Sequence, residues 1–142
     1  MEKSYDMSRF ADAQRADFPA ALREVKAGRK TSHWMWYIFP QIKGLGRSST
    51  SRFYAISDLD EAKAFMNDEY LRGNLIEISK ALLELETDDP LEVFGIPDNV
   101  KLCSSMTLFS YATDDNSVFL KVLDKFFGGE KDPRTISILN LK

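Results

Sequence analysis

Apolar residues between positions 71 and 85 recur every three to four residues, which is the spacing of one face of an α-helix. This face is formed by Leu71, Leu75, Ile78, Leu82 and Leu85. Shorter patterns of the same kind occupy much of the remaining chain, and few alternating stretches are long enough for a β-strand. The sequence therefore predicts an all-α fold, with residues 1–142 forming a single compact multi-helical domain.

Acidic residues that precede these patterns predict where several helices begin. Asp58 stands before one helix, and the Asp-Pro pairs at 89–90 and 132–133 each place a capping acid before a proline that suits a first turn. A further helix around Val122 is expected to stop at the glycine pair 128–129, because glycine commonly follows the last turn of a helix.

The N-terminal region is expected to hold two helices. A short one is predicted around residues 9–14. A second one is predicted to begin at Asp17, as its cap, and to end at Gly28. Pro19 would then fall in the first turn of the second helix, where no helical N–H partner is lost.

The composition excludes several classes of protein. Cys103 is the only cysteine and His33 the only histidine, so one chain forms no intrachain disulfide and no structural zinc site. No apolar run approaches the roughly 20 residues that span a bilayer, and no apolar signal segment follows the N-terminus. We therefore expect a cytoplasmic protein without a membrane or metal partner, and interpret Cys103 as a small buried hydrophobic residue. The sequence specifies neither a cofactor nor an oligomeric state.

Charge is distributed unevenly along the chain, although the net charge is only −3. Residues 25–57 contain no acid, whereas residues 58–100 contain twelve acids and three basic residues. The basic residues of the first stretch are Lys26, Arg29, Lys30, Lys43, Arg47 and Arg52. This asymmetry favours an anionic partner at one face. In the alternative interpretation, the two stretches fold against each other and neutralise their charges.

Residues 32–41 hold both tryptophans and the histidine of the chain. In one interpretation they form a short buried helix whose Trp N–H and Tyr O–H groups are hydrogen-bonded internally. The other interpretation is a ligand pocket, because the glycines, hydroxyls and arginines of residues 44–54 follow directly. Such residues let a backbone approach a ligand closely and hold an anionic oxygen, while Trp36 supplies a ring for stacking.

A second polar cluster lies in residues 101–109, where Ser104, Ser105 and Thr107 interrupt an otherwise apolar helix. Such hydroxyls often bond back to carbonyls one turn earlier, but a mismatch of this kind also marks functional sites. His33 is the candidate general acid or base, and Ser105 or Ser104 the candidate nucleophile. A hydrogen-bonded structural role is the alternative for His33.

These blocks carry a family resemblance. The segments 28–36, 39–41, 44–46, 101–109 and 127–135 resemble the signature blocks of the bacterial family called domain of unknown function 1810. The resemblance runs from about residue 9 to residue 139, and it implies a mostly helical domain without an established activity. Members are sometimes labelled calpastatin, but calpastatin-type inhibitors are disordered repeat proteins and this chain has no repeats.

The leading hypothesis is a domain that binds a small anionic ligand of nucleotide type, with its turnover left open. The proposed pocket residues are His33, Trp36, Arg47, Ser48, Lys101, Ser104, Ser105 and Thr107. The second hypothesis is a nucleic-acid-binding module, although an isoelectric point near 5.2 disfavours it. The third is a protein-interaction domain without catalytic activity, in which the aromatic residues belong to the core.

Overall fold

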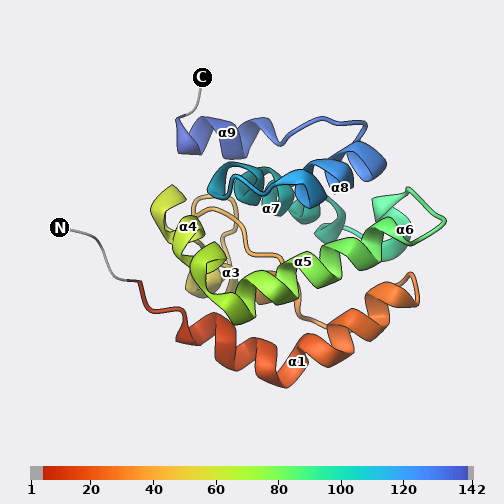
Figure 1. Ribbon diagram of the computed structural model, residues 1–142, viewed down its shortest axis with the longest axis horizontal. Coiled ribbons are helices and arrows are strands. Elements are labelled where there is room, and N and C mark those ends of the chain that lie inside the picture. The colour runs from red at the N-terminus through yellow and green to blue at the C-terminus, as the bar shows by residue number, and fades with distance from the viewer. Residues whose placement is uncertain (1–4, 141–142) are drawn as a thin grey trace.

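The computed structural model describes residues 5–140, and these residues contain nine α-helices (Figure 1). The prediction of an all-α fold is confirmed. From the N-terminus the helices are α1 (Ser8–Lys26), α2 (Met35–Ile38), α3 (Ser49–Tyr54), α4 (Leu59–Asn67), α5 (Glu69–Leu83), α6 (Pro90–Phe94), α7 (Asp98–Ala112), α8 (Ser117–Phe127) and α9 (Pro133–Leu139). None of them is both long and apolar enough to cross a lipid bilayer.

Helix α7 lies at the centre of the molecule. It packs against α4, α6, α8 and α9, and buried residues occur on all of its sides between positions 102 and 112. A helix that is surrounded by others has no polar face to turn to water. The hydroxyl residues of the second polar cluster therefore lie inside the protein, and Ser105 and Thr107 are both 0% exposed.

The remaining helices form layers around α7. Helix α1 packs on α5, α5 packs on α8, and α8 and α9 both pack on α7 (Figure 1). The apolar face predicted for α5 is confirmed, because its four members within the helix are all buried. They are Leu71, Leu75, Ile78 and Leu82. Burial of such a face supplies most of the stability of a helix of this length.

The prediction of two N-terminal helices is wrong, because α1 runs without interruption from Ser8 to Lys26. Pro19 lies inside it, and Figure 1 shows a bend about halfway along the helix. Phe10 and Val25, near opposite ends, are both fully buried, so tertiary packing along the whole length offsets the hydrogen bond lost at the proline. Asp17 is thus a mid-helix residue rather than a cap.

The other predicted helix starts are confirmed. The carboxylate of Asp58 accepts a hydrogen bond from the backbone N–H of Glu61 at 2.8 Å. Those of Asp89 and Asp132 cap α6 and α9 in the same manner, each before a proline in the first turn. Helix α8 ends at Gly128, whose φ of 62° is the left-handed conformation that glycine adopts without strain.

The aromatic segment of residues 32–41 contributes mainly to the core. Its only helix, α2, has four residues, and the preceding Trp34 is 1% exposed. The indole N–H of Trp34 donates to Glu24 at 3.0 Å, and the hydroxyl of Tyr37 donates to the carboxylate of Asp17. The interpretation of internally hydrogen-bonded aromatics is confirmed for these two residues, whereas His33 remains exposed.

Glu24 joins this segment to α1. Its carboxylate accepts hydrogen bonds from the backbone N–H groups of Thr31 (2.7 Å) and Ser32 (2.9 Å), from the Ser32 hydroxyl (2.7 Å) and from Trp34. Burial raises the pKa of Glu24, but the hydrogen bonds outweigh burial and lower this pKa from 4.5 to about 2.

Replacing Glu24 with glutamine is expected to reduce the fall in the free energy of unfolding that occurs at acidic pH. Because the folded pKa lies below the unfolded value, the carboxylate stabilises the fold fully above pH 4.5 and loses this effect as the pH falls toward about 2. We expect the variant to be about 1–2 kcal/mol less stable at neutral pH and to lose less stability on acidification. Urea unfolding across this pH range measures both effects, and parallel curves for the two proteins would contradict them.

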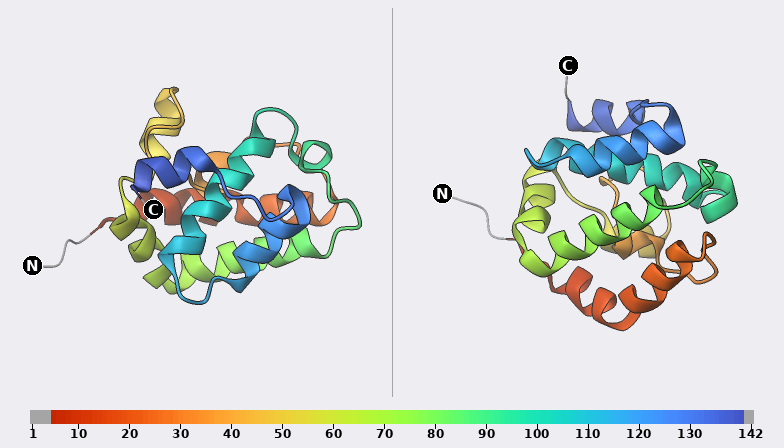
Figure 2. Two further views of the ribbon diagram at one scale, coloured as in Figure 1. Left: turned by 90° about the horizontal axis from the view of Figure 1, so that it is seen from above. Right: turned by 45° about the vertical axis from the view of Figure 1, so that its right-hand side comes forward.

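Residues 43–55 form an arm that includes α3. Figure 2 shows α3 standing away from the helical body, and none of its residues is buried. The two ends of the arm meet in a parallel β-bridge between Ile42 and Ile56, with hydrogen bonds from Lys43 to Ile56 at 2.8 Å and from Ile56 to Gln41 at 2.9 Å. The arm is thus pinned at its base, and it is partly exposed, with Leu45 and Tyr54 packed against the core.

Candidate functional site

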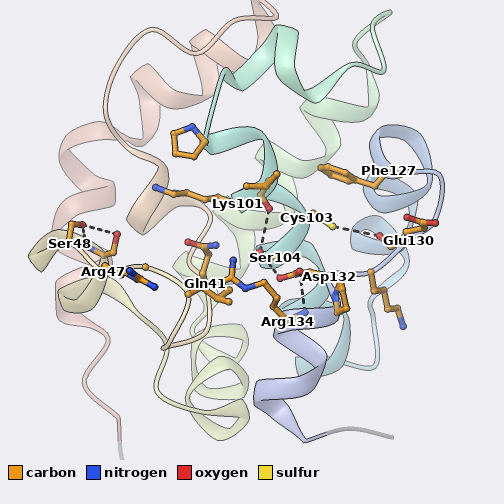
Figure 3. A pocket seen from close by; sticks show the side chains of 17 residues that line it. Gln41, Arg47, Ser48, Lys101, Cys103, Ser104, Phe127, Glu130, Asp132 and Arg134 are labelled. Atoms are coloured by element: carbon orange, nitrogen blue, oxygen red, sulfur yellow. Dashed lines mark hydrogen bonds between the residues drawn. The ribbon is translucent and has the colours of Figure 1, made fainter.

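A cavity of about 700 Å³ lies between the arm, the first turns of α7 and the loop that leads into α9 (Figure 3). We call it the main cavity. Arg47 and Ser48 line it from the arm, and Lys101 and Ser104 line it from α7. The fold thus brings together residues of the two polar blocks, which lie more than fifty positions apart in the chain. The volume is typical of small-molecule sites.

Cationic side chains predominate in the main cavity. Arg47, Lys101, Lys131 and Arg134 line it, against the acids Glu130 and Asp132. Figure 3 shows Arg47, Lys101 and Arg134 around the cavity, each on a different segment of the fold. Among residues 5–140, neither Arg47 nor Arg134 forms an ion pair, so two guanidinium groups are available to an anion.

The basic stretch is only slightly neutralised by the acidic one. Within the described part of the chain, one ion pair links the two stretches, between Lys30 and Asp98 at 2.8 Å. The same carboxylate lies 3.6 Å from the ammonium group of Lys101. The arm's Lys43, Arg47 and Arg52 are all exposed to solvent. The local positive field expected from the sequence is therefore retained around the arm.

Asp132 organises one wall of the main cavity. Its carboxylate accepts hydrogen bonds from the hydroxyls of Ser104 at 2.8 Å and Thr135 at 2.6 Å. Its backbone N–H donates to the hydroxyl of Thr107 at 2.8 Å. The hydroxyl oxygen of Ser104 also lies 3.3 Å from the carbonyl oxygen of Val100, one turn earlier. Two of the predicted hydroxyl residues, Ser104 and Thr107, therefore hold the α8–α9 loop against α7.

Ser105 lies away from this wall. It is 0% exposed, it does not line the main cavity, and its hydroxyl has no hydrogen-bond partner among the described residues. No hydrogen bond joins it to His33 in this part of the chain. The catalytic role of Ser105 therefore remains a prediction from the sequence, and its position in the core leads us to expect a structural one.

Replacing Ser105 with alanine is expected to leave ligand binding unchanged and to raise the free energy of unfolding by about 1 kcal/mol. A buried hydroxyl without a partner costs folding energy, and alanine removes it without leaving a large void. Thermal and urea unfolding measure the stability. Titration with a compound that binds the wild-type protein measures the affinity. Loss of binding in a folded Ser105→Ala protein would contradict a purely structural role for Ser105.

A smaller cavity of about 370 Å³, the side cavity, adjoins the main one. His33 and Trp36 line it, together with Asp98 and Lys101. Lys101 is shared by both cavities, and its ammonium nitrogen lies 5.7 Å from the centroid of the Trp36 ring. The structure therefore places His33 and Trp36 beside the main cavity, on the other side of Lys101.

Cys103 also lines the main cavity, and it is partly buried rather than fully buried. Its sulfur lies 3.6 Å from the carbonyl oxygen of Glu130. Burial, followed by the nearby Asp132 carboxylate, raises the pKa of the Cys103 thiol to about 11. The thiol is therefore protonated at neutral pH and is not an activated nucleophile.

Several cavity residues were not identified from the sequence. Gln41, Phe127, Asp132 and Arg134 all line the main cavity. Residues 127–135 contributed to the family resemblance, and the Asp-Pro pair at 132–133 was interpreted only as a helix start. The combination of a capping acid and a following arginine in a family block is the signal that could have identified this wall.

The comparisons agree with this fold. A family model described as "Protein of unknown function (DUF1810)" matches residues 4–139, so the chain belongs to this family. The chain is also similar to a crystal structure of the conserved hypothetical protein Rv1873 from Mycobacterium tuberculosis. The two are 42% identical, the match covers 97% of this chain and 99% of that one, and the TM-score is 0.94. The comparison with curated proteins gives no match.

Proposed function

We propose that the main cavity binds a small anionic ligand of nucleotide type. The observation that supports this most strongly is the convergence of Arg47, Lys101 and Arg134 on one cavity from three separate elements. Guanidinium groups bind phosphate oxygens through paired hydrogen bonds, and an ammonium group adds a point charge. A phosphate among these three groups would replace water around two unpaired arginines with charge-assisted hydrogen bonds.

Other side chains have supporting roles in this proposal. Ser48 and Ser51 bring hydroxyls to the cavity from the arm, and Phe127 provides an apolar surface. Ser104 and Thr107 act indirectly, by holding Asp132 in place. For turnover of the ligand, the proposal keeps His33 as general acid or base, because it is exposed in the side cavity next to Lys101.

A thermal-shift screen tests the proposal. Purified protein would be heated with inorganic phosphate, sugar phosphates, nucleotides and short single-stranded oligonucleotides. A ligand at about 100 times its Kd stabilises the native state by about 2.7 kcal/mol, so a binder raises the Tm. We expect a shift with small phosphate compounds that is lost in Arg47→Ala and retained in Arg52→Ala. Arg52 is a matched control because it is exposed on the same arm and does not line the main cavity.

A single-stranded nucleic acid is the second candidate ligand. Phe53, next to Arg52 on the arm, is 60% exposed, and an exposed ring beside cations is suited to stacking with bases. This reading predicts stabilisation by oligonucleotides alone, a steep loss of affinity with salt and dependence on Phe53 rather than Arg134. The absence of a shift with every compound would instead favour the protein-interaction domain.

A further inference from the structure

The two tryptophans of the chain have different environments. Trp34 is buried in the core, whereas Trp36 is partly exposed and its ring lines the side cavity. Trp36 also lines a narrow gap together with Gln41 and Gly46, and both of these residues line the main cavity as well. The indole of Trp36 therefore lies next to the main cavity both through Lys101 and through the base of the arm.

The residues that line the side cavity are suited to hold a planar ring. Trp36 gives it a flat aromatic surface, His33 an exposed imidazole, and Met35 and Ile96 apolar surface. Ile96 is 81% exposed, which leaves an apolar side chain at the rim without a partner in the described structure. Aromatic rings stack on bases of any sequence because every base has a π-face.

Lys101 connects the two cavities. Its ammonium group lies near the Trp36 ring and 3.6 Å from the Asp98 carboxylate, whose other oxygen already pairs with Lys30 at 2.8 Å. A cation–π contact at a partly exposed site is weak compared with a charge-assisted hydrogen bond to phosphate. An anion in the main cavity would therefore draw the ammonium group away from the indole and uncover the ring.

We infer that the ligand is a nucleoside phosphate whose phosphate lies in the main cavity and whose base lies against Trp36 in the side cavity. This inference rests on the proposed function and adds the second half of the ligand. Phosphate binding and base stacking are coupled through Lys101, because the group that binds the phosphate also covers the stacking surface in the free protein.

The inference is tested by calorimetric titration of the wild-type protein, Trp36→Leu, Trp36→Phe and Arg47→Ala. The titrants are AMP, GMP, CMP, UMP and ribose 5-phosphate, which has the sugar and the phosphate but no base. Circular dichroism and thermal unfolding of each variant establish that it is folded. Phe53→Leu is the matched control, because Phe53 is an exposed ring on the arm that lines neither cavity.

We expect at least one nucleotide to bind the wild-type protein about tenfold more tightly than ribose 5-phosphate. This gain should disappear in Trp36→Leu, be partly retained in Trp36→Phe and be unchanged in Phe53→Leu, while the affinity for ribose 5-phosphate stays constant. The nucleotide should also quench tryptophan fluorescence in the wild-type protein but not in Trp36→Leu.

Two other outcomes are distinguishable. If ribose 5-phosphate binds as tightly as every nucleotide and depends on Arg47, or if the nucleotide gain persists in Trp36→Leu, the base site is wrong and the proposed function stands. If no phosphate compound binds the wild-type protein, both the base site and the proposed function are wrong.

Discussion

Replacing Trp34 with alanine is expected to lower the free energy of unfolding by about 4 kcal/mol. Trp34 is 1% exposed, and its ring packs against those of Phe39 and Phe94, with centroids 6.2 and 6.4 Å away. Its indole N–H also donates to Glu24, which orders residues 31–34. The substitution therefore leaves a large void and removes one donor from a carboxylate that has several.

The control for this prediction is Phe53→Ala, which removes an aromatic ring that is 60% exposed and should change the stability by less than about 1 kcal/mol. Urea denaturation monitored by circular dichroism gives both values. Equal losses in the two variants would show that Trp34 does not hold the core together, and the assignment of the 32–41 segment to the core would fail.

Removing both free guanidinium groups, in the double variant Arg47→Ala/Arg134→Ala, is expected to weaken the binding of a nucleotide or sugar phosphate by about 100-fold or more. A hydrogen bond to a charged group contributes about 1.5–3 kcal/mol, and about 1.4 kcal/mol corresponds to a factor of ten in affinity. Both side chains are exposed and form no ion pair with another described residue, so the stability should change little.

A double variant of the same charge, Arg23→Ala/Arg52→Ala, separates contact from long-range attraction. Arg23 and Arg52 are also exposed, and neither lines the main cavity. Calorimetric titration of both double variants at low and high salt should show the large loss only in the first. Equal losses that disappear at high salt would mean that the general positive field attracts the ligand without a defined site.

Most helices were predictable because their signals are local. Apolar spacing and a capping acid lie within one or two turns of each other, as at Asp58 and in α5. The predicted interruption of α1 near Pro19 is wrong, because the packing of Phe10, Phe18 and Val25 along the helix outweighs the local penalty of the proline. That packing depends on helices far away in the chain, so no local pattern contains it.

The candidate site was predictable in its residue types and only partly in its geometry. The arginines, serines and lysine of the two blocks were identified, but whether the blocks line one cavity depends on where the arm lies relative to α7. The burial of Ser105 follows from the central position of α7, which its neighbours in sequence do not reveal. Asp132 is held in the site by hydrogen bonds with Ser104 and Thr107, which lie 28 and 25 residues earlier in the chain.

The most direct test of the anion site is a two-dimensional NMR titration of the isotope-labelled protein with AMP. Binding in the main cavity should shift backbone amide signals within residues 45–51, 100–104 and 130–134, apart from Pro133, because these three segments supply most of its lining. Signals from the middle of α5, which lies opposite α3 in the left view of Figure 2, should stay in place. Shifts confined to the exposed tip of the arm, or no shifts at millimolar AMP, would contradict binding in this cavity.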